Sequence, residues 1–135
     1  MTDLSPATKA FIDGLTFDAD GLIPAIAQQH DSGEVLMMAW MNRQSIVETL
    51  TGGRVVYWSR SRQALWRKGD SSGQEQRLIE FRVDCDRDCL LLLVDQIGVA
   101  CHTGRRNCFF TAIRDNNPIV VADVIIDPSH LYKGR

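Results

Sequence analysis

The sequence has no excess of positive charge, since fifteen lysines and arginines stand against seventeen aspartates and glutamates, which gives a net charge of −2. A protein that binds nucleic acid non-specifically usually carries a marked basic excess. No apolar run approaches the ~18 residues of a membrane-spanning helix, and the amino terminus lacks the basic and apolar regions of a signal peptide. We therefore expect no nucleic-acid or membrane partner, and a cytoplasmic location.

The chain also lacks repeats, low-complexity tracts and linkers, so we expect residues 1–135 to form one domain. It contains only four cysteines. Thiols stay reduced in the cytoplasm. The four are therefore better interpreted as metal ligands or core residues than as two disulfides.

Most of the local patterns along the chain predict strands. Ser5-Pro6 predicts the start of a helix that Gly14 ends, and Asn42 predicts the cap of a second helix that Gly52-Gly53 ends. Pro24 requires an edge position or a strand start. Strands are expected at residues 22–28 and 34–41, which form a hairpin around 31–33, and at 54–59, 76–84, 90–97 and 108–114. Residues 116–118 predict a turn, 119–126 a last strand or a segment that covers a partner subunit, and 127 onward a polar tail.

Charged and apolar residues alternate from residue 79 into a segment that is rich in aspartate and cysteine. On a strand, one face would carry Ile79, Phe81, Val83 and Cys85, and the other Glu80, Arg82, Asp84 and Asp86. The carboxylates and the first thiol would then point to opposite sides. This arrangement predicts two metal sites, one with hard oxygen ligands and one with soft sulfur ligands.

The sulfur site would use Cys85, Cys101 and Cys108, since three protein ligands with an open position are typical of catalytic zinc. Free cysteines are also common as small buried hydrophobic residues. That alternative suits Cys89, which opens a leucine run, better than the two cysteines in the segment 101–108, which is rich in histidine, glycine and arginine.

The oxygen site would use Asp84, Asp86 and Asp88, which have the spacing of a hard-cation loop. The glycine and glutamate of a calcium hand are missing, and Arg87 stands where a further oxygen ligand would be needed. Three carboxylates this close repel one another, and magnesium would neutralise them. The alternative is a solvated acidic hairpin tip.

Basic residues, small hydroxyl residues and glycines cluster around two tryptophans, as in a site that binds a phosphate and stacks against a base. The alternative for any one of them is an exposed polar loop. His102, beside Cys101, is a candidate general acid/base or fourth zinc ligand, although a lone histidine is more often structural. The candidate substrate-binding residues are Trp58, Ser59, Arg60, Ser61, Arg62, Trp66, Lys68, Ser72, Thr103, Gly104 and Arg105.

These residues indicate a metal-dependent enzyme with a phosphorylated aromatic substrate, and hydrolysis is the natural reaction class for zinc. The chain resembles the phosphoribosyl-AMP cyclohydrolases of histidine biosynthesis. The matching stretches are Gly21-Leu22-Ile23-Pro24-Ala25, Gly33-Glu34-Val35-Leu36-Met37, Ala39-Trp40-Met41-Asn42, Tyr57-Trp58-Ser59-Arg60-Ser61-Arg62, Leu65-Trp66-Arg67-Lys68-Gly69, Ser72-Gly73, Asp84-Cys85-Asp86 with Asp88, and Ala100-Cys101-His102-Thr103-Gly104-Arg105.

The resemblance implies hydrolytic opening of the adenine ring of phosphoribosyl-AMP at the N1–C6 bond, with zinc-activated water and magnesium. It implies magnesium on Asp84, Asp86 and Asp88, and zinc on Cys85 of one subunit with Cys101 and Cys108 of the other, hence a homodimer. The implied fold is a compact pseudobarrel of mixed sheet, which agrees with a β-rich α+β chain with short helices. Departures from the family pattern, at Gln29, Asp70-Ser71 and Asn107, touch no metal ligand.

Two other functions compete with this interpretation. A zinc nucleobase deaminase attacks the same kind of carbon, but that class shows His-x-Glu and Pro-Cys-x-x-Cys, and here His102 is followed by Thr103-Gly104 with no Cys-x-x-Cys pair. A zinc-stabilised RNA-binding module could use Trp58, Trp66 and the arginines. The acidic charge balance opposes this second alternative.

Overall fold

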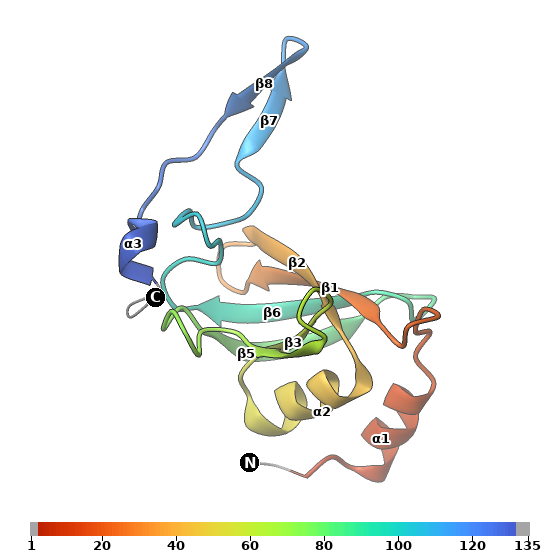
Figure 1. Cartoon of the computed structure of the whole chain (residues 1–135). Helices are drawn as coiled ribbons and strands as arrows, with labels where there is room; N and C mark the ends of the chain where they lie inside the picture. The colour runs from red at the N-terminus through yellow and green to blue at the C-terminus, as the bar shows by residue number, and fades with distance from the viewer. Residues whose placement is uncertain (1–2, 132–135) are drawn as a thin grey trace.

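The computed structural model describes residues 3–131, which form a curled six-stranded sheet, two helices on it and a projecting arm (Figure 1). The helices are α1 (Pro6–Asp13), α2 (Arg43–Gly52) and the short α3 (Pro128–Leu131). The strands of the sheet are β1 (Ile23–Gln29), β2 (Val35–Met41), β3 (Val56–Ser59), β4 (Ala64–Arg67), β5 (Gln76–Val83) and β6 (Leu90–Gln96). The arm carries the hairpin of β7 (Thr111–Arg114) and β8 (Asn117–Val120).

The sheet is mixed, with the strand order β4-β3-β2-β1-β6-β5. β1 pairs with β6 in parallel, whereas the other neighbouring strands pair antiparallel. β1 is therefore a central strand, and of the two positions proposed for Pro24 only the strand start is correct. Proline is tolerated there because the pairing with β6 begins one residue later, at Ala25 and Leu90.

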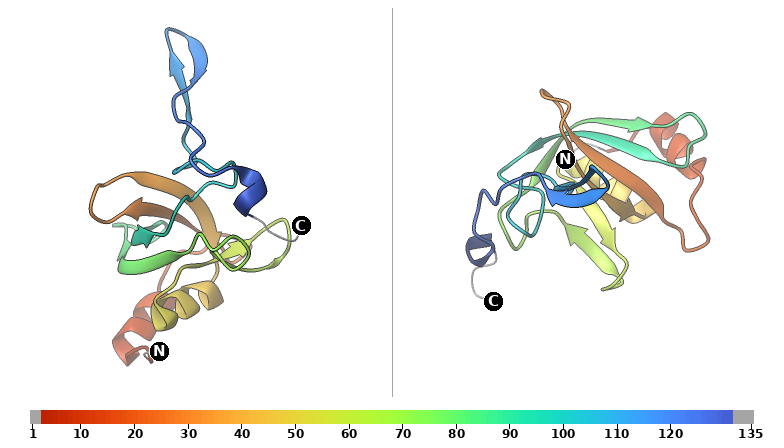
Figure 2. Two further views of the ribbon diagram at one scale, coloured as in Figure 1. Left: turned by 90° about the vertical axis from the view of Figure 1, so that its left-hand side faces the viewer. Right: turned by 90° about the horizontal axis from the view of Figure 1, so that it is seen from above.

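The sheet curls until the segment before β3 meets β5. Arg54 and Arg77 form an isolated bridge, the Val55 N–H donates to the Gln76 carbonyl oxygen at 2.9 Å, and the Leu78 N–H donates to Gly53 at 2.8 Å. The result is a half-barrel, seen from above in Figure 2. The predicted β-rich α+β class with a mixed sheet and short helices is confirmed, and the sheet is a half-barrel where the family resemblance implied a compact pseudobarrel.

The concave side of the half-barrel holds the core because β1 and β6 alternate strictly between buried and half-buried residues. Ile23, Ala25 and Ala27 of β1 are fully buried, as is Leu92 of β6. Each large apolar side chain that is removed from water contributes about 1.5–3 kcal/mol. The pairing of these two strands also places the segments that follow them, which carry the site.

The two helices predicted from their caps are confirmed. The Ser5 hydroxyl accepts a hydrogen bond from the Thr8 N–H at 3.1 Å, and the Asn42 side chain accepts one from the Ser45 N–H at 2.8 Å. Gly53 ends α2 in the left-handed conformation at φ 76°, which glycine adopts at no steric cost.

The alternation predicted for β5 is wrong at its start. A β-bulge between Leu78 and Glu80 inserts Ile79 as an unpaired residue, so Ile79 is 55% exposed while Leu78, Phe81 and Val83 pack against the core. The strand also ends at Val83, so the alternation no longer places Cys85 opposite the aspartates. Other differences are β4, in a segment for which no strand was predicted, and α3 in the predicted polar tail, where Leu131 is buried.

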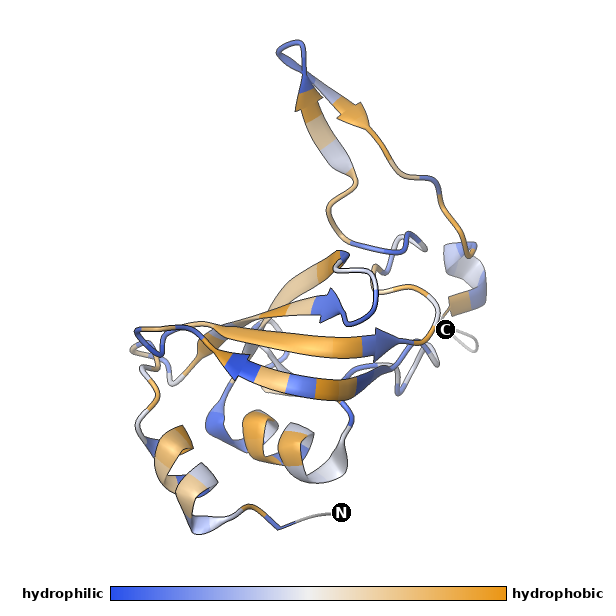
Figure 3. Ribbon diagram, turned by 180° about the vertical axis from the view of Figure 1, so that it is seen from behind, coloured by the Kyte–Doolittle hydropathy of each residue, from blue (hydrophilic) through white to orange (hydrophobic). Residues whose placement is uncertain are grey.

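The arm extends away from the half-barrel, and many of its residues are hydrophobic except at the hydrophilic tip of the hairpin (Figure 3). A turn was predicted at residues 116–118. It is formed by Asp115 and Asn116 instead, because Asn117 and Pro118 pair in β8. Residues 119–126 were predicted to form a last strand or a segment that covers a partner subunit, and the strand itself ends at Val120. The exposed large apolar side chains from Phe109 onward are Phe109, Ile113, Ile119, Val120, Val121, Val124 and Ile125.

Within residues 3–131, no helix has the length and apolar character needed to cross a membrane.

Candidate functional site

A pocket of about 370 Å³ opens at the end of the half-barrel where β6 finishes. It collects side chains from the β3–β4 hairpin, from the loop after β4 and from the loop after β6. The lining residues are Ser59, Ser61, Arg62, Trp66, Lys68, Gly69, Ser71, Ser72 and His102. The structure thus brings together many of the residues predicted to bind substrate, and adds Gly69 and Ser71. The position of these two in the same polar loop as Ser72 was the available sequence signal.

The aromatic wall of the pocket is held by the core. Tyr57 pairs with Trp66 across β3 and β4, and the two rings lie 5.4 Å apart at 40°. The buried Tyr57 hydroxyl donates to the side-chain oxygen of Gln76 at 2.6 Å. Trp66 is 36% exposed, so a fixed ring presents an apolar surface to the pocket.

Lys68 lines the pocket and is also a neighbour of the thiols of Cys101 and Cys108. It is only 5% exposed, and its Nζ donates to the Ala100 carbonyl oxygen at 2.9 Å. Burial lowers the pKa of Lys68, while the neighbouring thiols of Cys108 and Cys101 act in the opposite direction. The Lys68 ammonium in turn acts to lower the pKa of the Cys108 thiol.

Cys101 and Cys108 form a pair of neighbouring thiols, here called the thiol pair. Cys101 is buried, with its Sγ 3.0 Å from the Thr103 hydroxyl, whereas Cys108 as a whole residue is exposed. The pKa of the Cys108 thiol is raised to about 12, by burial first and then by Cys101, against a lowering effect of Lys68. The Cys108 thiol resists ionisation until a cation arrives, and two adjacent sulfurs are a fitting donor set for zinc, which binds thiolates.

The loop from Ile97 to Cys108 folds back on itself and thereby brings the thiol pair together. The Ala100 N–H donates to the Arg106 carbonyl oxygen at 2.9 Å, and the Gly104 N–H to that of Cys101 at 3.0 Å. Gly104 has φ +85°, and a Cβ on it would collide with the Ile126 carbonyl oxygen. Only glycine satisfies both conditions, so this turn depends on Gly104.

The acidic cluster is the turn between β5 and β6. The ligand oxygens of Asp84, Asp86 and Asp88 all lie within 4.8 Å of one another. The Asp84 carboxylate accepts hydrogen bonds from the N–H groups of Asp88 at 3.0 Å and Cys89 at 3.1 Å, which fold the turn around it. Three exposed carboxylate oxygens in this arrangement suit a hard cation such as magnesium.

Cys85 lies in the same turn and is exposed, far from the thiol pair of its own chain. β6, seven residues long, separates the turn from the loop with Cys101, and a strand of that length spans roughly 20 Å. Among the residues that the structure describes, the acidic cluster is the only group of three or more possible metal ligands. One chain therefore does not assemble the predicted set of three sulfurs.

Other predicted residues lie outside the pocket. Trp58 and Arg60 line an adjoining open groove, where the Arg60 guanidinium lies 4.7 Å over the Trp40 ring. Arg105 holds the arm instead, through the Ala122 carbonyl oxygen at 2.9 Å and the Phe110 ring at 4.1 Å. Thr103 contacts Cys101, and Gly104 accepts hydrogen bonds from the N–H groups of Ile125 and Ile126.

The acidic cluster predicts a pH-dependent response to magnesium. The pKa of Asp88 is raised from 3.8 to about 6, first by its hydrogen bond with Asp86 and then by that with Asp84. A carboxyl with a raised folded-state pKa stabilises the metal-free fold below its usual pKa, and this contribution is lost as the pH rises through about 6. Asp84, with a lowered pKa, contributes in the opposite sense and loses its contribution as the pH falls.

Magnesium must displace the Asp88 proton to bind there, so it should raise the unfolding midpoint more at about pH 8 than at about pH 5. Calorimetry with and without the cation measures the difference. In Asp88→Asn the pH dependence of the magnesium shift should disappear. Equal shifts at both pH values in the wild type would contradict the prediction that Asp88 takes part in binding the cation.

Comparisons with known proteins agree on one family. The family model for phosphoribosyl-AMP cyclohydrolase matches residues 37–110, which include the pocket, the acidic cluster and the thiol pair. A protein of Rhodospirillum centenum named phosphoribosyl-AMP cyclohydrolase is 71% identical over 124 residues, covering 92% of this chain and 93% of the relative. Proteins of the same name from Paramagnetospirillum magneticum and Paracoccus denitrificans are 63% and 68% identical, covering 93% and 79% of this chain and 96% and 88% of those relatives.

Proposed function

The chain belongs to the phosphoribosyl-AMP cyclohydrolase family, and from this membership we propose that it opens the adenine ring of phosphoribosyl-AMP by hydrolysis in histidine biosynthesis. The observation that carries the proposal is 71% identity over 92% of the chain to a protein of that name. We propose that it acts in the cytoplasm, where its cysteines stay reduced.

In the proposed reaction one water adds to C6 of the purine and the N1–C6 bond breaks. The product is a formamidino-imidazole carboxamide that keeps every nitrogen of the substrate. The ribosyl group on N1 makes the purine cationic, so C6 is already electrophilic before the protein acts. The protein therefore has to hold the substrate, deliver water to one carbon and move protons.

The pocket has the chemistry to hold such a substrate. Arg62 and Lys68 are its cations, and Ser59, Ser61 and Ser72 offer hydroxyl groups for a phosphate. Within residues 3–131, no acidic side chain forms an ion pair with Arg62. The Trp66 ring supplies a stacking surface for the purine.

We assign zinc to Cys101 and Cys108 with Cys85 of a second copy of the chain, and magnesium to Asp84, Asp86 and Asp88. Zinc supplies Lewis acidity that activates water near neutral pH when it is bound. Because Cys85 lies between Asp84 and Asp86, a second copy that brings its Cys85 to the thiol pair also brings its acidic cluster to the pocket. This removes the separation of roughly 20 Å between the two clusters of one chain.

The arm supports a homodimer. Ile113 and Ile125 are 70% and 66% exposed, and they belong to a group of seven exposed large apolar side chains between residues 109 and 125. An apolar surface of this kind usually marks an interface between proteins. We propose that the arm packs against a second copy of the chain.

His102 is our candidate for proton transfer to the departing N1 or from the attacking water. It follows Cys101, it lines the pocket and it is exposed. Among the described residues it has no hydrogen-bond partner, which argues against a purely structural role. An imidazole free to exchange protons beside the thiol pair suits a general acid/base.

Replacement His102→Asn should keep zinc and the oligomeric state while lowering turnover roughly a hundredfold. The pH–rate profile should also lose one of its limbs. His130→Asn, an exposed histidine of α3, serves as the matched control and should retain normal activity. A weakened zinc affinity that excess metal restores would instead make His102 a ligand, and full zinc with normal turnover would contradict its role.

The function itself is tested by incubating the purified protein with phosphoribosyl-AMP and weighing the product by mass spectrometry. We expect a gain of one water without release of ammonia, and no reaction with AMP, whose purine is uncharged. Ammonia release would favour the deaminase alternative. Salt-dependent RNA binding without turnover would favour the RNA-binding alternative.

A further inference from the structure

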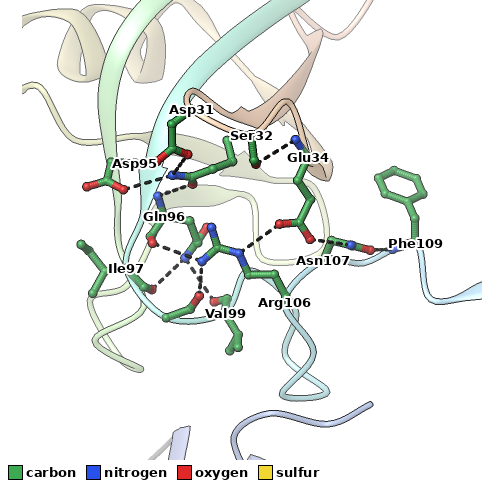
Figure 4. A network of polar contacts seen from close by, with 12 residues as sticks. Asp31, Ser32, Glu34, Asp95, Gln96, Ile97, Val99, Arg106, Asn107 and Phe109 are labelled. Atoms are coloured by element: carbon green, nitrogen blue, oxygen red, sulfur yellow. Dashed lines mark hydrogen bonds and ion pairs between the residues drawn. The ribbon is translucent and has the colours of Figure 1, made fainter. Parts of the chain in front are cut away.

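Glu34 lies just before β2, outside the pocket and both metal clusters, yet its carboxylate binds the two residues that precede Cys108. Oε1 accepts a hydrogen bond from Arg106 Nε at 3.2 Å, and Oε2 accepts one from Asn107 Nδ2 at 2.9 Å. Both contacts are part of the network in Figure 4. The Cys108 N–H donates to the Leu36 carbonyl oxygen at 2.8 Å, which is a second attachment to the same strand.

Arg106 connects this attachment to the other end of the loop. Its Nη1 donates to the Gly98 carbonyl oxygen at 2.7 Å and to that of Gln96 at 3.3 Å. Its own carbonyl oxygen accepts from Ala100, the residue before Cys101. The planar guanidinium of Arg106, two residues before Cys108, is therefore bound to the end of β6, from which the chain leads on to Cys101.

A second set of bonds fixes the strand end itself. The Gln96 side-chain nitrogen donates to the carbonyl oxygens of Ile97 at 2.9 Å and Val99 at 3.2 Å. The Gln96 backbone N–H donates to the Gln29 side chain of β1 at 2.9 Å. The segment after β6 thus starts from a rigid point, and Arg106 together with Glu34 determines where its far end returns.

From this geometry we propose that Glu34, acting through Arg106 and Asn107, is a positioning residue that holds Cys108 beside Cys101 for metal binding. The inference rests on the proposed assignment of zinc to the thiol pair. In the absence of Glu34, Arg106 loses its counter-charge and Asn107 loses its acceptor, so Cys108 is held mainly by the Leu36 hydrogen bond. Metal affinity then falls because the ligands must be ordered when the ion binds.

The test compares the zinc affinity of purified variants by competition with a chromophoric chelator. Glu34→Ala should weaken zinc binding roughly tenfold to a hundredfold, the range found when outer-sphere partners of metal ligands are removed. Arg106→Lys should behave in the same way, because an ammonium keeps the charge but cannot reach the carboxylate and two carbonyl oxygens together. Glu34→Gln, which retains one acceptor, should lie between Glu34→Ala and the wild type.

The matched control is Glu48→Ala, which removes another carboxylate that binds an arginine through two hydrogen bonds, to Arg67 at 2.7 and 2.8 Å. Glu48 is 35% exposed and Glu34 is 32% exposed, so the two variants should change the unfolding midpoint to a similar extent. Of these two variants, only Glu34→Ala should change the zinc affinity. The visible spectrum of the cobalt-substituted protein should also change only in the Glu34 and Arg106 variants.

The inference would be overturned if the Glu34 and Arg106 variants bound zinc as tightly as the wild type, even if they melted earlier. A wild-type protein that binds no zinc would instead refute the proposed metal assignment. The two failures are distinguishable because the wild type is measured first.

Discussion

Replacing Asp84 by asparagine is expected to leave zinc bound while reducing magnesium-dependent turnover to background. Asp84 is the carboxylate around which the acidic turn folds, through the N–H groups of Asp88 and Cys89. An asparagine side chain keeps one hydrogen-bond acceptor but loses the charge and one oxygen ligand, and magnesium demands oxygen ligands in a tight geometry. The thiol pair lies at the other end of β6, and the retained acceptor preserves the hydrogen bonds that fold the turn carrying Cys85, so the proposed zinc ligands should stay in place.

Zinc content by atomic absorption and turnover in a magnesium titration measure the two effects separately. Asp13→Asn provides the control, because Asp13 is an exposed carboxylate of α1 whose ion pair with Arg43 lies on the surface. Surface pairs of this kind contribute little, so Asp13→Asn should keep full activity. Loss of zinc together with activity in Asp84→Asn would show that the two metal sites are not separate.

The second large effect concerns the cysteines. Cys85→Ala and Cys101→Ala should each lose zinc and activity, because a set of three ligands cannot hold the ion with one ligand missing. Cys89→Ala is the matched control, since Cys89 lies in the same turn as Cys85, but within residues 3–131 its thiol makes one hydrogen bond, to the Leu90 carbonyl oxygen at 3.9 Å. We expect this variant to retain zinc and turnover. Retention of zinc by Cys85→Ala would contradict the proposed ligand set.

Much of the fold could be predicted because its signals are local. Ser5 and Asn42 cap their helices through hydrogen bonds to residues three positions along the chain. The hairpin of β1 and β2 and the long hairpin of β5 and β6 follow from apolar strands separated by short polar turns. The parallel pairing of β1 with β6 could not be predicted in this way, because it joins segments more than sixty residues apart.

The predictions from sequence are wrong where contacts between distant residues determine the local structure. The bulge at Ile79 shifts the alternation of β5 by one residue, and no local residue type announces it. β4 forms because Trp66 packs on Tyr57 across the β3 hairpin. The arm has strand-forming residues, but its extension from the half-barrel depends on the contacts of Gly104 and Arg105 with residues 122–126.

For the site, sequence reasoning identified residue chemistry better than residue partners. Ser59, Arg62, Trp66 and Lys68 do meet in one pocket. Arg67 and Arg106 stand beside the predicted residues Lys68 and Arg105 in the sequence, but Glu48 and Glu34 bind them. A sequence motif cannot indicate a counter-ion that lies nineteen or seventy-two positions away. It also could not indicate the distance between Cys85 and the thiol pair.

The most direct test of the account is to mix Cys85→Ala with Cys101→Ala under conditions of confirmed subunit exchange. If the site is shared between two copies, the mixed dimer contains one intact set of Cys85, Cys101 and Cys108 and one set without Cys85 and Cys101. Random pairing should then restore about a quarter of the wild-type turnover and zinc content, although each variant alone has neither. If exchange is confirmed and neither turnover nor zinc returns, the site is not assembled from two chains.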